Sequence, residues 1–326
     1  MSPMIDSFGR KISYLRVSVT DRCDLRCSYC MSERMTFLPK PDLLTLEELS
    51  KLCHGFIDRG IRKIRISGGE PLVRRDVMEL FKDIAPRLNS DLEELTLTTN
   101  ATQLSKYVDT LAGLGVKRVN ISLDSLKPDV FTSLTRRPVL DIVLDGVQAA
   151  KDAGLKIKIN TVVLPENLTE IPDMVRWAHA QNFDLSLIEI MPMGQVEQAR
   201  AQQFVPMQAA KNILESQFTL APILPSGNLG GPARYHKVAQ TGGRIGFISP
   251  LTNNFCAGCN RIRMTCTGRI YMCLGQDDYV DLRDIIRTGG DLNAAVSAAL
   301  REKPEAHDFT ISDRPGVARH MSVTGG

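Results

Sequence analysis

The sequence has little net charge and no long hydrophobic run. Its 326 residues carry 40 Lys and Arg against 37 Asp and Glu, a formal charge of +3. This balance predicts no strong nucleic-acid or membrane partner, so any anion binding has to be local, made by a few basic side chains in a pocket. There is no run of about 18 apolar residues, and residues 1–12 contain no apolar secretion signal. We therefore expect a cytoplasmic protein.

Cysteine is scarce, but six of the eight cysteines form two groups. In a reducing compartment they are more readily metal ligands or isolated side chains than disulfide partners. The first group is Cys23, Cys27 and Cys30, at C-x-x-x-C-x-x-C spacing. A structural zinc site or an ordinary four-iron cluster takes four ligands, so a cluster on three thiolates leaves one iron open for a small molecule.

The second group is Cys256, Cys259 and Cys273. Thr267-Gly268 is typical of a two-residue hairpin turn, which would pair Cys273 with Ile262 and bring it back beside Cys259. These three cysteines are candidate ligands of a second centre.

Two cysteines lie outside the groups. Along the predicted hairpin, Cys266 would lie roughly 13 Å from Cys273, too far to share its centre. We interpret Cys266 and Cys53 as small buried hydrophobes or surface bystanders.

Short β-rich segments alternate with helical ones from Leu15 to about Met191, a pattern typical of βα units and a parallel sheet. The predicted strands are Leu15–Thr20, Lys63–Gly68, Leu92–Asn100, Arg118–Asp124, Lys156–Val163 and Asp184–Ile190. The predicted helices are Thr45–Arg59 with a capping box, Asp76–Arg87, Leu104–Leu114, Asp141–Ala153 and Ile171–Gln181. Beyond residue 193, helices at Met207–Ser216, Asp281–Arg287 and Leu292–Lys303 and strands at Tyr235–Gln240 and Arg244–Ile248 are predicted.

Alternation along the six strands separates an apolar from a polar face. The apolar face carries Leu15, Val17, Val19, Ile64, Ile66, Leu95, Leu97, Val119, Ile121, Leu123, Ile157 and Ile159. The polar face carries Arg16, Ser18, Thr20, Arg65, Ser67, Thr96, Thr98, Asn100, Asn120, Ser122, Asp124, Lys158 and Asn160. A complete eight-stranded barrel is filled mainly with bulky branched side chains. We therefore predict an incomplete (β/α)6 barrel over residues 1–193 with a smaller α+β region over 194–326; a twisted sheet with one wet face is the alternative.

Further motifs point to ligands. The turn Ser67-GGEP lets backbone approach a ligand closely, and Glu70 can accept hydrogen bonds from an ammonium group. Arg261 and Arg263 share one face beside Cys259; alone they would fit a solvated edge strand. With Arg16, Arg65 and Lys158 from the polar strand face they favour an anionic, polyphosphate-like substrate. The Gly-Gly end is typical of a disordered tail, or of one that threads a narrow site.

The three-cysteine loop with Tyr29, the GGEP turn and the βα repeat resemble the radical S-adenosylmethionine superfamily. With Cys256-AGC, Asn260-RIR and the Gly-Gly end, the sequence is most similar to the GTP 3′,8-cyclase family of molybdenum cofactor biosynthesis. The resemblance implies two four-iron clusters, one on each cysteine group. It also implies S-adenosylmethionine contacts at Tyr29, Gly69, Glu70, Ser122 and Met193, and GTP contacts at Arg16, Arg65, Thr98, Lys158, Arg261, Ile262 and Arg263.

The same resemblance assigns substrate positioning to Arg16, Arg261 and Arg263, and a site role to the tail residues Gly325 and Gly326. It implies an electron donor, cyclic pyranopterin monophosphate synthase as the downstream enzyme, and a homodimer. The sequence departs from the family pattern at Asn100-Ala101, where Asn-Gly is common, and in the tail before the glycines.

Two other hypotheses remain open at this point. A different radical S-adenosylmethionine enzyme with an auxiliary cluster, such as a peptide-modifying one, has little use for a cationic interior. A zinc- or cluster-bearing nucleic-acid module is favoured by the cysteine pairs near Arg261 and Arg263. The weak net charge and the GGEP turn are against this module.

Overall fold

The computed structural model describes residues 4–224, 231–310 and 316–325, and its central feature is one curved, open sheet. The twelve strands of these residues follow the order β12-β11-β10-β1-β2-β3-β4-β5-β6-β9-β8-β7. From β10 to β9 all neighbouring strands are parallel, whereas β11, β12, β8 and β7 are added antiparallel at the two edges. The fold is therefore an incomplete α/β barrel, as predicted.

The six predicted strands are all present, with ends that differ by a few residues. The strands are β1 Tyr14–Ser18, β2 Lys63–Ser67, β3 Glu94–Thr99, β4 Arg118–Ser122, β5 Lys156–Val162, β6 Asp184–Ile188, β7 Leu220–Pro222, β8 Arg234–Val238, β9 Arg244–Ile248, β10 Arg261–Met264, β11 Arg269–Tyr271 and β12 Tyr279–Asp281. The parallel pairing of β9 with β6 and of β10 with β1 was not predicted. Because of it, the chain beyond residue 193 extends the same sheet at both edges.

The helices follow the predicted pattern, with α4, α7 and α11 in addition. They are α1 Leu46–Asp58, α2 Val77–Ile84, α3 Val108–Gly113, α4 Pro128–Thr135, α5 Leu140–Asp152, α6 Ile171–Ala180, α7 Arg200–Gln203, α8 Met207–Glu215, α9 Arg283–Thr288, α10 Leu292–Arg301 and α11 Met321–Thr324. The capping box of α1 is present: the Thr45 side chain accepts a hydrogen bond from the Glu48 backbone, and the Glu48 carboxylate accepts one from the Thr45 backbone. Helix α1 therefore begins where the sequence predicts.

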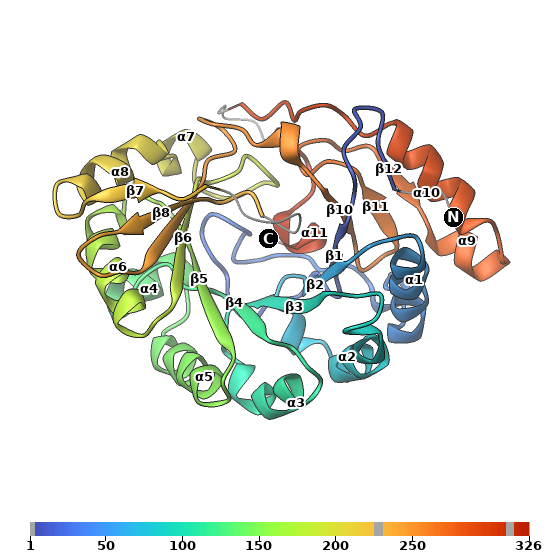
Figure 1. Cartoon of the computed structure of the whole chain (residues 1–326), viewed down its shortest axis with the longest axis horizontal. Coiled ribbons are helices and arrows are strands. Elements are labelled where there is room, and N and C mark those ends of the chain that lie inside the picture. The colour runs from blue at the N-terminus through green and yellow to red at the C-terminus, as the bar shows by residue number, and fades with distance from the viewer. Residues whose placement is uncertain (1–3, 225–230, 311–315, 326) are drawn as a thin grey trace.

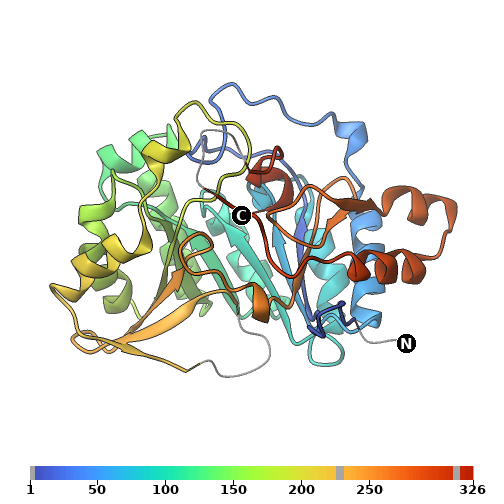
Figure 2. The same ribbon diagram turned by 90° about the horizontal axis from the view of Figure 1, so that it is seen from above.

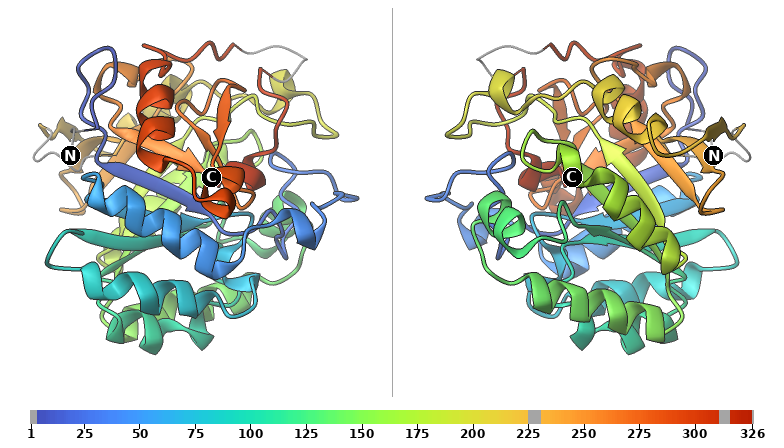
Figure 3. Two further views of the ribbon diagram at one scale, coloured as in Figure 1. Left: turned by 90° about the vertical axis from the view of Figure 1, so that its right-hand side faces the viewer. Right: turned by 90° about the vertical axis from the view of Figure 1, so that its left-hand side faces the viewer.

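Helices α1 to α6 cover the convex face of the sheet (Figure 1). Figure 1 shows α1 to α6 outside the arc of strands and α11 with the C-terminal end inside it. Seen from above, the C-terminal segment stays near the middle of the molecule (Figure 2). In the side views, α2, α3 and α5 lie beneath the sheet and the red C-terminal segments lie above it (Figure 3).

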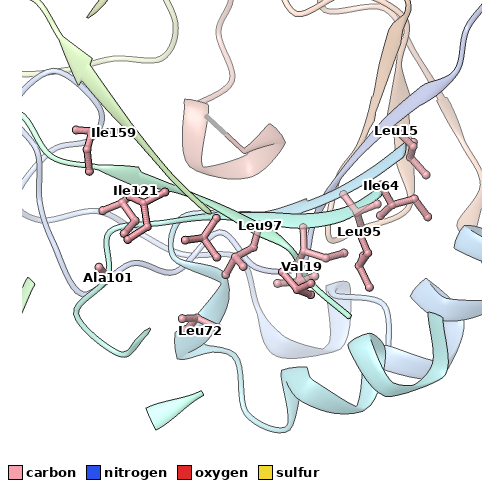
Figure 4. Close-up of a cluster of buried hydrophobic side chains, with 14 of the residues drawn as sticks. Leu15, Val19, Ile64, Leu72, Leu95, Leu97, Ala101, Ile121 and Ile159 are labelled. Carbon is pink, nitrogen blue, oxygen red and sulfur yellow. The ribbon is translucent and has the colours of Figure 1, made fainter. Parts of the chain in front are cut away.

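The apolar strand face forms the core under these helices, as predicted. Leu15, Ile64, Leu97 and Ile121 are 0% exposed and belong to one cluster with the inner faces of the helices. Figure 4 shows these side chains on the helix-facing side of the sheet. At about 25 cal/mol for each Å² of buried apolar surface, this core is the main stabilising contribution to the fold. The opposite, polar face is left to line the interior of the arc. No helix of the described residues is long and apolar enough to span a membrane.

Candidate active site

Two adjoining cavities occupy the concave face of the sheet. The first is lined by the Cys23, Cys27 and Cys30 loop and by the carboxyl ends of the central strands. The second is lined by the Cys256, Cys259 and Cys273 group and by basic side chains. The two cavities share the lining residues Asn160, Ile188, Met191 and Met321. The concave face therefore joins two cysteine groups that are more than 200 residues apart in the sequence.

The GGEP turn holds the first cysteine loop through backbone contacts. Gly69 N donates to the carbonyl oxygen of Thr20 and Glu70 N to that of Arg22, both at 2.8 Å. A Cβ atom on Gly69 would lie 2.4 Å from the Arg22 carbonyl oxygen, so only glycine permits this approach. Gly69 also lines the first cavity. The turn therefore fixes the cysteine loop and borders the ligand space at the same time.

Glu70 faces the protein rather than the cavity. Its carboxylate accepts hydrogen bonds from the backbone amides of Leu72 (3.0 Å) and Asn100 (2.6 Å) and from the Thr99 hydroxyl (2.8 Å). Burial raises its pKa to about 7, although these hydrogen bonds oppose the shift. The predicted contact of Glu70 with an ammonium group stays a prediction, because this carboxylate already joins the turn to the end of β3.

Buried polar pairs surround the first cysteine group. The Tyr29 hydroxyl donates to the Asp124 carboxylate at 2.7 Å, and burial raises the pKa of Asp124 to about 6. The Asn100 amide donates to Asp24 at 2.7 Å and lies 3.7 Å from the Cys23 sulfur. Tyr29, Ser122 and Met193, three of the predicted cosubstrate contacts, line this cavity. So does Thr98, whose buried hydroxyl has no hydrogen-bond partner within the described structure.

Two rows of side chains across neighbouring strands form the wall of the second cavity. In one row Lys63, Tyr14 and Arg261 are register partners on β2, β1 and β10. In the next row the partners are Arg65, Arg16 and Arg263. Neighbouring strands lie about 4.8 Å apart, so the guanidinium groups of the second row are held side by side. This arrangement concentrates positive charge on the concave face of the sheet.

The described lining of the second cavity contains His307 and no Asp or Glu. It also contains eight Lys and Arg side chains: Arg16, Lys63, Arg65, Arg118, Lys158, Arg244, Arg261 and Arg263. Lys63 and Arg118 reach Glu94, and Arg244 reaches Asp184, at 2.6 to 2.8 Å behind the wall. Burial lowers the pKa of Arg16 to about 10 and lowers the pKa values of Lys158 and Arg263 further below their ordinary values.

Tyr14 lies at the centre of this charge. Burial alone would raise its pKa, but the charges of Arg65, Arg16, Lys63 and Arg261 lower it to about 8. Lys63 lies 5.0 Å and Arg65 5.6 Å from the centre of its ring, within the range of cation–π contacts. The cavity is therefore built for a polyanion, because an anion in it would relieve the repulsion among buried cations.

Each cysteine group suits an iron–sulfur cluster by its donor chemistry. The three thiols of each group line one cavity and interact electrostatically with one another. Thiolates are the usual protein ligands of such clusters. Within the described residues, no three His, Cys, Asp or Glu side chains lie close enough together to bind a single metal ion. Cys53 and Cys266 are fully buried away from both cavities, in agreement with the prediction.

The hairpin register differs from the prediction by one residue. Arg263 pairs with Tyr271 and Met264 with Ile270, so the ladder leads Cys273 toward Arg261 and not toward Ile262. Four residues, Thr265 to Gly268, lie between the two strands. The Thr265 amide donates to the carbonyl oxygen of Arg269 at 2.9 Å, the Arg269 amide donates to the Thr265 hydroxyl at 3.1 Å, and Gly268 takes a left-handed conformation (φ 89°). The two-residue turn was therefore wrong, although Cys273 still joins its group.

The described part of the tail lies inside the arc. Arg263 donates to the carbonyl oxygen of Gly325 at 2.5 Å, and a Cβ on Gly325 would lie 2.0 Å from the Ser67 hydroxyl. Met321 lines both cavities. Gly325 is thus in a space that only glycine fits, whereas Gly326 is outside the described residues.

Sequence reasoning missed Tyr14, Lys63 and Arg118, which line the second cavity. Strand alternation could have predicted all three, because each lies two residues before a residue of the polar face and so points to the same side of the sheet. Tyr235 and Arg244 could not be found in this way, since they come from β8 and β9, which reach the site only through long-range pairing.

Structural comparison supports the fold. SuiB from Streptococcus suis, in a crystal structure with S-adenosylmethionine bound, has a TM-score of 0.59 over 96% of this chain and 77% of its own, at 16% identity. The same protein bound to the precursor peptide SuiA gives a TM-score of 0.57, over 96% of this chain and 76% of its own, also at 16% identity. At this identity the likeness concerns the fold alone.

Sequence comparison identifies the family. Residues 17–178 match the Radical SAM superfamily and residues 183–309 match Molybdenum Cofactor Synthesis C. A GTP 3′,8-cyclase from Rhizobium etli is 55% identical over 99% of this chain and 94% of its own. One from Brucella ovis is 54% identical over 99% of this chain and 96% of its own. The chain therefore belongs to the GTP 3′,8-cyclase family within the radical S-adenosylmethionine superfamily.

Proposed function

We propose that this protein converts GTP to 3′,8-cyclo-7,8-dihydroguanosine 5′-triphosphate, the first step of molybdenum cofactor biosynthesis. The observation that carries the proposal is the second cavity, which is lined by eight Lys and Arg and by no Asp or Glu within the described structure and adjoins the first cysteine group. Within the described residues the lining of this cavity holds no carboxylate, and a nucleoside triphosphate would supply negative charge to it. A neutral or basic peptide would supply no such charge.

The first cavity provides the S-adenosylmethionine site in this proposal. Cys23, Cys27 and Cys30 would hold a four-iron cluster, which with bound S-adenosylmethionine supplies one-electron cleavage to a 5′-deoxyadenosyl radical. Tyr29, Gly69, Ser122 and Met193 would enclose the cosubstrate. Glu70 would hold the GGEP turn in place through its hydrogen bonds to the end of β3. The apolar share of the lining, including Leu25, Phe131, Ile190 and Met321, excludes water from this space.

The second cavity provides the GTP site. Arg16, Arg65, Lys158 and Arg263 would bind the triphosphate, since guanidinium groups grip phosphate oxygens bidentately. Arg261 and Ile262 would contact the base end, beside Cys259. Thr98 lies in the adjoining cavity, where its unpartnered hydroxyl would reach the nucleotide from the side of the cosubstrate. The tail residues Gly325 and Gly326 would complete the wall next to Arg263.

A second four-iron cluster on Cys256, Cys259 and Cys273 is part of the same proposal. It is supported by three thiols around one end of the cationic cavity. We also infer that residues 1–193 form the radical-generating part and 194–326 the part that holds this cluster and the substrate. An electron donor, the downstream cyclic pyranopterin monophosphate synthase, a homodimer and a cytoplasmic location stay predictions from the family resemblance.

Product formation tests the proposal directly. The clusters are reconstituted in the absence of oxygen, and reductant and S-adenosylmethionine are then added. We expect release of 5′-deoxyadenosine when GTP is present, and not when ATP or an unrelated peptide replaces it. Equal release with ATP would contradict the GTP assignment. If the protein purified without oxygen contains zinc and shows no iron–sulfur absorbance, the proposed radical S-adenosylmethionine activity is refuted.

A double substitution separates substrate binding from cluster binding. Arg261→Ala with Arg263→Ala should weaken GTP use while leaving the iron content of both clusters unchanged. Removal of charge-assisted hydrogen bonds, each contributing about 1.5–3 kcal/mol, predicts a loss of at least about tenfold in kcat/KM for GTP. Loss of iron from the second group would instead assign these arginines a structural role.

A further inference from the structure

Lys303 is a buried lysine behind the second cysteine group. It follows α10, is 2% exposed and does not line either cavity. Its ammonium lies 3.7 Å from the Cys259 sulfur, 3.3 Å from the carbonyl oxygen of Arg261 and 2.5 Å from that of Met272. Because Lys303 lines neither cavity, we expect no direct contact between its ammonium and the substrate.

The ammonium group has hydrogen-bond acceptors but no acidic partner. Within the described residues, no carboxylate lies at ion-pair distance from Lys303, and its contacts are the sulfur and the two carbonyl oxygens. The nearby Arg10 differs: it donates to the Cys256 carbonyl oxygen at 3.0 Å but is paired with Asp6 at 2.6 Å. An unpaired buried charge is unfavourable. The positive charge of Lys303 would be compensated by negative charge on the Cys259 thiolate and on a metal centre that this sulfur binds.

We propose that Lys303 is the fixed countercharge of the second iron–sulfur cluster, an inference that rests on the cluster proposed above. Its charge offsets that of the thiolate-ligated cluster, and its donation to sulfur favours the more negative, reduced state. Both effects raise the reduction potential, since hydrogen bonds to sulfur and net charge set it. Its bonds to the carbonyl oxygens of Arg261 and Met272 also hold β10 next to the residue before Cys273. Lys303 is a positioning residue, acting on GTP only through the cluster.

The test isolates the second cluster. In a parent variant with Cys23, Cys27 and Cys30 all changed to Ala, the reconstituted protein carries iron only at the second group. Iron and sulfide per chain are measured, and the reduction potential is obtained by titration followed by electron paramagnetic resonance. A parent without iron would refute the second cluster itself, independently of Lys303.

Three further variants in this parent separate charge from hydrogen bonding. Lys303→Gln keeps a donor for the carbonyl oxygens but loses the charge, Lys303→Met loses both, and the exposed Lys156→Gln is the control. We expect both Lys303 variants to lower the reduced-to-oxidised ratio at a fixed potential at least tenfold, about 59 mV for one electron. Lys156→Gln should match the parent. An unchanged potential in an iron-loaded Lys303→Gln would overturn the proposal.

A loss of iron is also informative. If Lys303→Gln loses iron while its circular dichroism stays that of the parent, the countercharge is needed to hold the cluster, which supports the proposal. Lys303→Arg keeps the charge and should retain iron and potential. If Lys303→Arg loses iron or potential as Lys303→Gln does, the shape of the side chain and not its charge controls the cluster, and the proposal fails.

Discussion

Replacement of Arg65 by methionine should stabilise the folded protein and weaken GTP binding at the same time. Arg65 lies at the end of the second row, between Thr96 and Arg16 on the neighbouring strands, and its side chain lines the second cavity. Burial lowers its pKa, its Nε atom has no hydrogen-bond partner within the described structure, and its cation–π contact with Tyr14 spans 5.6 Å. The residue is therefore unfavourable for folding and favourable only when an anion binds.

The two effects have opposite signs and can be estimated separately. Replacement of a buried ion pair by apolar side chains of similar volume is neutral or stabilising by about 1–4 kcal/mol. Arg65 is repelled by neighbouring cations, so we expect its replacement by methionine to raise the unfolding midpoint in urea. Loss of a charge-assisted hydrogen bond to phosphate removes about 1.5–3 kcal/mol of binding free energy. GTP binding should then weaken about 10- to 150-fold.

Two equilibrium measurements check this prediction. Urea unfolding of the ligand-free protein gives the stability, and GTP titration of the reconstituted protein without S-adenosylmethionine gives the affinity. Arg75→Met is the matched control, because its side chain is 94% exposed and should change neither quantity. An Arg65→Met variant that is less stable than the parent and binds GTP equally well would refute the reasoning, since it would make Arg65 a structural residue.

Lys158 and Arg319 give two further predictions. Burial, followed by repulsion from Arg65, lowers the pKa of Lys158 well below its ordinary value, so the folded protein binds fewer protons than the unfolded chain and stability rises with pH between the two pKa values. Bound triphosphate should raise the pKa of Lys158 again, so the protein should take up protons when GTP binds at alkaline pH. Calorimetry in buffers of different ionisation enthalpy measures this uptake, which should be smaller in Lys158→Gln. Equal uptake in the two proteins would contradict a contact between Lys158 and the triphosphate. Arg319 donates to the carbonyl oxygens of Cys273 (3.3 Å) and Leu274 (2.6 Å), which fixes the tail to the second cysteine group. Arg319→Ala should make removal of the tail by carboxypeptidase about 10- to 100-fold faster and leave the overall unfolding midpoint nearly unchanged. A tail as resistant as that of the parent would show that Arg319 does not fix it.

Local patterns were sufficient to predict the central sheet. Alternation separated Leu15 and Ile64, which are in the core, from Arg16 and Arg65, which line the second cavity. This works because the two faces of a strand meet different surroundings, helices on one side and ligand space on the other. The capping box at Thr45 is equally local, as its partner is three residues away.

Long-range pairing could not be predicted in the same way. Strand β10 joins β1 across more than 240 residues of sequence, and no local pattern states that partner. The hairpin after it has four residues between its strands, with Gly268 in a left-handed conformation, whereas Thr267-Gly268 alone is typical of a two-residue turn. Glu70 points toward backbone amides because the end of β3 lies beside it, a contact that depends on the sheet.

The register of β1 places the two cysteine groups near opposite ends of this strand. Tyr14, at the start of β1, is the partner of Arg261, two residues after Cys259, whereas the loop with Cys23 follows the other end of the strand. From Tyr14 to Ser18 a strand rises about 13 Å, so a ligand beside Cys259 has to extend along β1 to approach the first group. The basic rows lie along that path. A small anion could neutralise the rows but would not span them, whereas an elongated nucleotide can do both. We therefore expect the concave face to bind an elongated anion better than a small one.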